Sequence, residues 1–262
     1  MQQTTPRSRS VCKTVLVIAS LGVIALLAGC RKADHPTLTL SIATSLQDVM
    51  VEIESNYQRE HGTVDFRNNF GASGTLAREI EQGAPVDAII SAGSKPIDDL
   101  AAKGLLLPDT RSDLLRNSLV LIAPQDSKLV AFDDLVQPAV RLLAMGDPAS
   151  VPAGQYGLET LKALQLYDKI KSKIVLGKDV RQVLTYVETG NADAGLVYAT
   201  DAHNSSKVRV VAVASESAHH PIVYPMAAVS GTRNQQAVRD FLAYLGSPAA
   251  GAIFIRGGFT MA

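Results

Sequence analysis

Strands and helices alternate along most of this chain, and that alternation limits its possible folds more than any other feature. Thr37 to Ala43 alternates and is rich in β-branched residues, which predicts a strand. Apolar residues then recur at helical spacing up to Gly62, and Val64 to Phe70 predicts a second strand. Because a strand–helix–strand unit brings its two strands parallel in one sheet, we predict an α/β protein.

The alternation continues to the C-terminus and divides into two blocks. Further strands are predicted at 85–92, 119–123, 142–145, 173–176, 194–197, 208–213 and 224–229. The last strand and the helices after it are too few to stand alone, so we expect them to return to the first block. The predicted architecture is two lobes, 37–117 plus 224–262 and 118–223, each a mostly parallel sheet flanked by helices. A hinge at the two crossings joins them.

Residues 1–29 are predicted to be an export signal. Arg7, Arg9 and Lys13 precede an apolar run, 15–28, that is shorter than the ~20 residues of a membrane-spanning helix. The run ends in Leu-Ala-Gly-Cys, which resembles the bacterial lipobox, so Cys30 is predicted to be lipidated and to become the first residue of the mature chain. Residues 30–36 are interpreted as a tether. An ordinary signal peptide with an incidental cysteine stays open as the alternative.

The charge balance argues against several classes of partner. Cleavage before Cys30 removes three of the 25 basic residues and no acid, which leaves 22 against 25 and a net charge of −3. The absence of a basic patch argues against nucleic acid. The mature chain has one cysteine, so no intramolecular disulfide is expected, and only two of its five histidines are adjacent in sequence, which makes a metal-ion site improbable.

Helix starts supply the candidate binding groups. Ser45 and Ser73 are predicted to cap helices in the first lobe, Ala153 and Val180 lie at helix starts in the second, and Tyr198 ends a strand there. Their N–H and O–H groups would form a pocket of donors for a small oxyanion, with no charged side chain required. About seven such bonds at roughly 1.5–3 kcal/mol each suffice for micromolar to nanomolar binding once closure and desolvation are subtracted.

A site made only of donors would also discriminate between anions. A fully deprotonated oxyanion offers only acceptors, whereas monoprotonated phosphate brings a donor that needs an acceptor. Asp179 is the nearest acid and is predicted to cap a helix instead. The pattern therefore favours molybdate, tungstate or sulfate over phosphate, and pocket size must separate these three.

Several runs resemble the periplasmic molybdate-binding proteins of ABC importers. The matching runs span the mature chain in order: Ala43-Thr44-Ser45-Leu46, Phe70 to Asp87, Gly146-Asp147-Pro148, Val151-Pro152-Ala153-Gly154, Asp179-Val180-Arg181, Gly195 to Tyr198, and Gly258-Phe259-Thr260. The resemblance implies a type II periplasmic-binding-protein fold. It also implies an oxyanion held by two serines, two backbone amides and a tyrosine, which correspond to Ser45, Ser73, Ala153, Val180 and Tyr198.

The resemblance further implies a monomer without a cofactor that carries molybdate, and also tungstate, to the permease and ATPase of an importer. Its expected location is the periplasm or the cell-envelope surface, on a lipid anchor at Cys30. One departure is that Ala72 and Gly74 flank Ser73 where family members often have more serines. Two alternatives remain: a carrier of another oxyanion such as sulfate, and a serine hydrolase with Ser73 as nucleophile. The second is disfavoured because Thr75 replaces the last glycine of the Gly-x-Ser-x-Gly motif.

Overall fold

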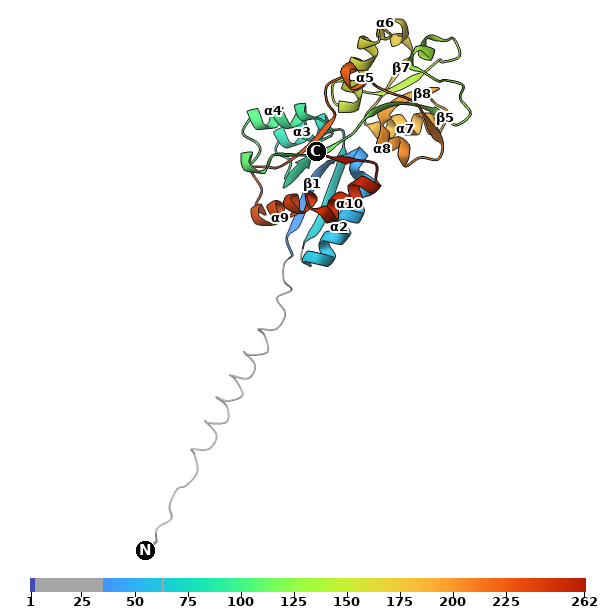
Figure 1. Cartoon of the computed structure of the whole chain (residues 1–262). Helices are drawn as coiled ribbons and strands as arrows, with labels where there is room; N and C mark the ends of the chain where they lie inside the picture. The colour runs from blue at the N-terminus through green and yellow to red at the C-terminus, as the bar shows by residue number, and fades with distance from the viewer. Residues whose placement is uncertain (3–34, 63) are drawn as a thin grey trace. The chain divides into compact units, whose positions relative to one another are not determined.

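The computed structural model describes residues 1–2, 35–62 and 64–262. The predicted export signal, Cys30 and most of the predicted tether lie outside the described residues, and residues 1–35 are a unit separate from Pro36–Ala262. Within the described part of the chain, every helix is too short or too polar to cross a membrane. The unit from Pro36 onward contains two sheets with helices packed on them, and we call each sheet with its helices a lobe (Figure 1).

The first lobe is built on a six-stranded sheet with the order β11-β4-β10-β3-β1-β2. Its strands are β1 (Thr37–Ala43), β2 (Asp65–Gly71), β3 (Ala88–Ile90), β4 (Ser112–Arg116), β10 (Val223–Ala228) and β11 (Thr260–Met261). Strand β1 pairs in parallel with β2 and β3, while β10 pairs antiparallel with β3 and β4, and β11 antiparallel with β4.

The second lobe is built on a five-stranded sheet with the order β7-β6-β8-β5-β9. Its strands are β5 (Leu119–Pro124), β6 (Leu143–Gly146), β7 (Ile174–Gly177), β8 (Ala194–Tyr198) and β9 (Val208–Val213). Strand β6 lies parallel to β7 and β8, whereas β5 pairs antiparallel with β8 and β9.

The sheets are therefore more mixed than the predicted mostly parallel ones, for a topological reason. Parallel pairs occur where a helix carries the chain back between strands, as from β1 through a helix to β2. Antiparallel pairs involve strands next to the crossings. The chain passes from β4 straight into β5, and it returns from β9 into β10. Strands entering from the other lobe run opposite to their neighbours β3 and β8.

Helices cover both faces of the first sheet. They are α2 (Gln47–His61), α3 (Ser73–Glu81), α4 (Ser94–Ala102), α9 (Gln235–Leu245) and α10 (Pro248–Arg256). Helices α2, α9 and α10 lie on one face and α3 and α4 on the other (Figure 1). Side chains of β1 such as Leu38 and Leu40 pack toward the first group, and Ile89 of β3 packs with the second. The main helices of the second lobe are α5 (Pro152–Ala163) and α7 (Val180–Glu188). The lobe also contains two short helices, α6 (Tyr167–Ile170), which follows α5, and α8 (Ala199–His203), which follows β8.

The crossings between the lobes meet at partly buried polar contacts. Asn117 lies in the first crossing, between β4 and β5, and its backbone N–H donates to the carbonyl of Ile222 in the second crossing at 3.3 Å. Its side-chain amide nitrogen lies 2.9 Å from the hydroxyl of Thr200 and 3.2 Å from that of Tyr224. The two crossings are therefore held together by defined polar contacts.

Candidate functional site

One small cavity between the lobes brings together all five residues that the sequence nominates. Ser45 and Ser73 come from the first lobe, and Ala153, Val180 and Tyr198 come from the second. The other residues lining it are Ala43, Thr44, Gly71, Ala72, Ala92, Val151 and Pro152. None of these twelve carries an acidic or basic side chain, so the cavity is uncharged as predicted.

The cavity is smaller than an oxyanion. Its volume of about 10 Å³ is room for roughly one water-sized sphere. A tetrahedral ion of five atoms would need more space than this closed arrangement leaves, so its entry would require the lobes to separate. An open groove of about 340 Å³ adjoins the cavity and shares Val151 and Pro152 with it. Arg78 and Lys95 line that groove together with Glu81 and Asp99, so its charged side chains balance, and all of them lie outside the cavity.

Ser73 holds its hydroxyl at the cavity through a bond that the sequence did not predict. It is the first residue of α3, the N-cap is Ala72, and no side chain caps this helix, so the predicted capping role of Ser73 is wrong. Its Oγ instead accepts the backbone N–H of Ala92 at 2.9 Å. Because that bond uses an oxygen lone pair, the hydroxyl proton of Ser73 stays free for another acceptor.

Ser45 is also not a helix cap. A 3₁₀ turn, Thr44–Leu46, precedes α2, and neither start has a side-chain cap. Ser45 is the middle residue of this turn and lies two residues before the first residue of α2. Its buried Oγ lies 3.0 Å from the phenol oxygen of Tyr224. Residues Ser45 and Ser73 therefore both use their side chains between elements that are distant in sequence.

Ala153 and Val180 present backbone N–H groups at the cavity. They are the second residue of α5 and the first of α7, and amides in a first turn have no partner within their own helix. Asp179 caps α7 by accepting the N–H of Gln182 at 2.8 Å, which confirms its predicted role. Helix α5 starts close against β6 because Gly154 has no side chain, and a Cβ there would overlap the carbonyl oxygen of Gly146.

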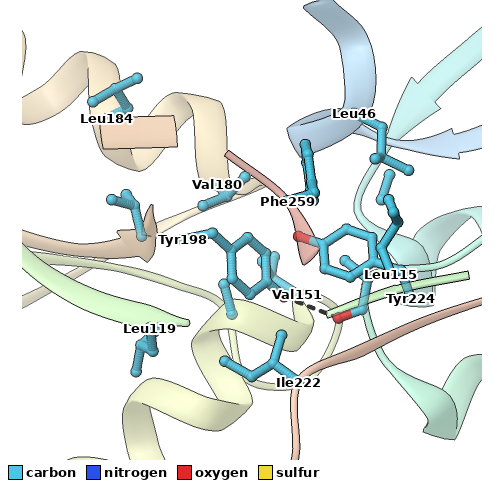
Figure 2. Packing of buried hydrophobic residues seen from close by; sticks show 14 of the residues in the cluster. Leu46, Leu115, Leu119, Val151, Val180, Leu184, Tyr198, Ile222, Tyr224 and Phe259 are labelled. Atoms are coloured by element: carbon cyan, nitrogen blue, oxygen red, sulfur yellow. Dashed lines mark hydrogen bonds between the residues drawn. The ribbon is translucent and has the colours of Figure 1, made fainter. Parts of the chain in front are cut away.

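Tyr198 spans the two lobes. It is the last residue of β8, and its hydroxyl donates to the carbonyl of Ala92 in the first lobe at 3.0 Å. Burial raises the pKa of its phenol well above the usual value, so Tyr198 remains a neutral donor at physiological pH. Its ring lies 5.6 Å from that of Tyr224, with Val151 and Val180 beside Tyr198 and Leu46 and Leu115 beside Tyr224 (Figure 2).

Two further contacts between the lobes flank the cavity. The backbone N–H of Gly74 donates to the carbonyl of Ser150 at 3.0 Å, and a Cβ on Gly74 would lie 2.7 Å from that oxygen. The absence of a side chain on Gly74 thus allows this close approach. On the other side, the guanidinium of Arg181 pairs with the carboxylate of Asp48, which also accepts the side-chain amide of Asn204 at 3.2 Å. Asp48, in the first turn of α2, thus joins the lobes.

A buried carboxylate lies behind this pair. Asp201 accepts the backbone N–H of Tyr198 at 3.3 Å, and its other oxygen lies 3.6 Å from Nε of Arg181. Burial raises the pKa of Asp201 to about 7, although Arg181 opposes that rise. Sequence reasoning missed this residue, and its signal was the spacing from Tyr198, which matches a capping box at the start of α8.

Comparison with known proteins identifies the class. The model of a family described as bacterial extracellular solute-binding protein matches residues 38–260.

This chain belongs to that solute-binding protein family.

It is 42% identical over 257 residues to the Bacillus subtilis protein named "Putative ABC transporter substrate-binding lipoprotein YvgL", which covers 95% of this chain and 98% of that protein. It is 41% identical to the molybdate-binding protein ModA of Escherichia coli, over 89% of this chain and 93% of that one. Among solved structures, the chain aligns with one titled "substrate binding domain of putative molybdenum ABC transporter from Clostridium difficile". The TM-score is 0.69 and the identity 42%, over 86% of this chain and 99% of that one.

These matches confirm the predicted family resemblance and the predicted two-lobed fold. The matched family is described as one of solute-binding proteins. The Oγ of Ser73 accepts a backbone N–H, and no histidine is among the described residues that line the cavity.

Proposed function

We propose that this solute-binding protein captures molybdate, and also tungstate, in the cavity between its lobes and delivers it to an ABC importer. The observation that carries the proposal is the uncharged cavity lined by Ser45, Ser73, Ala153, Val180 and Tyr198. The names of the ModA relatives support molybdate as the ligand. In this proposal residues 37–117 with 224–262 form one lobe and 118–223 the other.

The electrostatics of such a site come from backbone groups. Helices α3, α5 and α7 all begin at the cavity, and each start carries about half a positive charge from its aligned peptide dipoles. The serine hydroxyls and first-turn amides add directed donors. A dianion is thereby stabilised without a buried cation, whose own desolvation would offset much of the attraction.

Binding is coupled to lobe movement in this proposal. As the lobes separate slightly to accept the ion, the bond from Tyr198 to the Ala92 carbonyl breaks and the phenol proton becomes available to the ligand. The bound ion then replaces that contact as the link between lobes. The closed, loaded form is the one that we propose the importer recognises, with the protein held at the membrane by a lipid on Cys30.

A thermal-shift series tests the proposal. Molybdate, tungstate, sulfate and phosphate are each added to the mature protein, and a ligand at 100 times its dissociation constant adds about 2.7 kcal/mol to stability. Large shifts are expected with molybdate and tungstate and little with phosphate. A shift with sulfate alone would assign the site to another oxyanion, and no shift with any of the four would refute oxyanion capture.

The variant Ser73→Ala extends the test to one residue. It removes one hydroxyl donor from the cavity, and the expected loss of affinity is about 1.5–3 kcal/mol, or roughly 10- to 150-fold. Calorimetry measures the affinity, and the unliganded melting temperature checks that the lobes stay folded. An unchanged dissociation constant would remove Ser73 from the proposed site.

A further inference from the structure

We propose that Tyr224 is a positioning residue that directs the proton of Ser45 toward the ligand, within a hydrogen-bond relay that starts at Asn117 in the hinge. The proposal deepens the proposed function and rests on it. The relay would make Ser45 a fixed donor, and it would thereby help the site to prefer unprotonated oxyanions.

The orientation of the Asn117 side-chain amide determines which groups of the relay donate and which accept. Its side-chain carbonyl accepts the backbone N–H of Ser118 at 2.9 Å, so its NH₂ group must face the other way. That NH₂ group lies 2.9 Å from the hydroxyl of Thr200 and 3.2 Å from the hydroxyl of Tyr224. An amide NH₂ can only donate, so the oxygen of Tyr224 accepts in this contact.

The next step follows from the single proton on the phenol. The oxygen of Tyr224 accepts from Asn117, and its other recorded partner is Oγ of Ser45 at 3.0 Å. The phenol is completely buried, and an unmade bond there would cost the full desolvation of the group. Tyr224 therefore donates its proton to Ser45.

Ser45 completes the relay at the cavity. Its oxygen accepts from Tyr224, so its own proton has to go elsewhere, and Ser45 lines the cavity. Ser73 is arranged in the same sense, because its oxygen accepts the N–H of Ala92. In both serines the oxygen accepts a hydrogen bond from a group of the protein, and the hydroxyl proton remains available to a ligand in the cavity.

Two serines that can only donate toward the ligand have a consequence for selectivity. A ligand that carries its own proton, such as hydrogen phosphate, needs an acceptor, and a serine freed from its relay would rotate to provide one. Removing the hydroxyl of Tyr224 is therefore expected to weaken binding of molybdate and to weaken the rejection of phosphate. A residue with only a packing role would change both affinities in parallel.

The test compares Tyr224→Phe with a matched control, Tyr244→Phe. Tyr244 is also a tyrosine of the first lobe, and among the described residues its hydroxyl has no hydrogen-bond partner. Calorimetry with molybdate and phosphate is run on wild type and both variants. We expect Tyr224→Phe to weaken molybdate binding about five- to tenfold. We also expect it to reduce the ratio of the affinity for molybdate to the affinity for phosphate, while Tyr244→Phe changes neither the affinity nor the ratio.

A double-variant cycle shows whether Tyr224 acts through Ser45. In a Ser45→Ala background, Tyr224→Phe is expected to cost molybdate no further affinity. If Tyr224→Phe does not fold, Asn117→Ala replaces it, with a smaller loss in the same direction. Wild type that binds no oxyanion would overturn the proposed function and the relay together. Tight wild-type binding of molybdate with additive losses, or with parallel losses for molybdate and phosphate, would overturn the relay alone.

Discussion

The ion pair between Asp48 and Arg181 joins the two lobes beside the cavity, and Asp48→Asn is expected to weaken ligand binding without unfolding either lobe. The side chain of Asp48 is 48% exposed and that of Arg181 is 28% exposed, so solvent screens much of their attraction. Partly exposed pairs are worth about 0.2–1 kcal/mol, and the amide oxygen that replaces the carboxylate in this variant would still accept from Asn204. The expected loss is therefore at most about fivefold in the molybdate dissociation constant.

Calorimetry at low and at high salt measures this effect. Because salt screens exposed charges, the difference between Asp48→Asn and wild type is expected to shrink as salt rises. Asp168→Asn is the matched control, since it removes a pair with Lys171 that lies wholly in the second lobe. Equal affinities of Asp48→Asn and wild type at low salt would refute the idea that this pair stabilises the closed form.

Arg181, the partner of Asp48, also faces the buried Asp201. Arg181→Gln is expected to lose the same affinity and also to raise the pKa of Asp201 further above 7, so that above pH 7 its stability falls below that of wild type by up to about 1.4 kcal/mol per pH unit. Arg181→Gln with Asp201→Asn should regain the stability but not the affinity. A double variant as unstable as Arg181→Gln, judged by urea unfolding, would contradict this division of roles.

Three further predictions concern other parts of the molecule. Burial raises the pKa of Glu54 to about 7, so between about pH 4.5 and 7 the folded state keeps a proton that the unfolded state has lost, and stability falls as pH rises through this range. Glu54→Gln should remove up to about 3 kcal/mol of that fall, measured by urea unfolding. The exposed control Glu60→Gln should not. Gly154→Ala should destabilise the second lobe by about 1–3 kcal/mol and weaken molybdate binding, whereas Gly231→Ala, with open space around it, should do neither. Cys30→Ala should move the protein from the membrane to the soluble fraction, and unchanged fractionation would refute lipidation at this residue.

The elements that position the site could be predicted because each has a local signal. Strand β1 follows from the alternation of apolar and polar residues. The end of α2 follows from Gly62, which adopts the left-handed conformation. The start of α7 follows from Asp179, whose carboxylate accepts a first-turn backbone N–H. Strands β4 and β11 were missed. Strand β4, with the sequence Ser-Asp-Leu-Leu-Arg, shows no alternation that would mark it as a strand. The two-residue β11 forms where β4 offers it a free edge.

The five site residues were predicted as neighbours, but the way their groups are held was not. Ser45 and Ser73 were expected to cap helices, which is what a serine before a helix most often does. Both instead bond to groups far away in the sequence, Tyr224 and Ala92. The same distance hides Asp48, Arg181 and Asp201, whose pairing exists only once the lobes meet.

The most direct test of the central claim is a crystal structure of the protein with molybdate, in which anomalous scattering locates the molybdenum atom. We predict one strong peak between the lobes, with the oxygens of the ion within hydrogen-bond distance of Ser45, Ser73, Ala153, Val180 and Tyr198 and of no charged side chain. A peak at another place, or an ion held by Arg78 or Lys95 in the adjoining groove, would contradict the account.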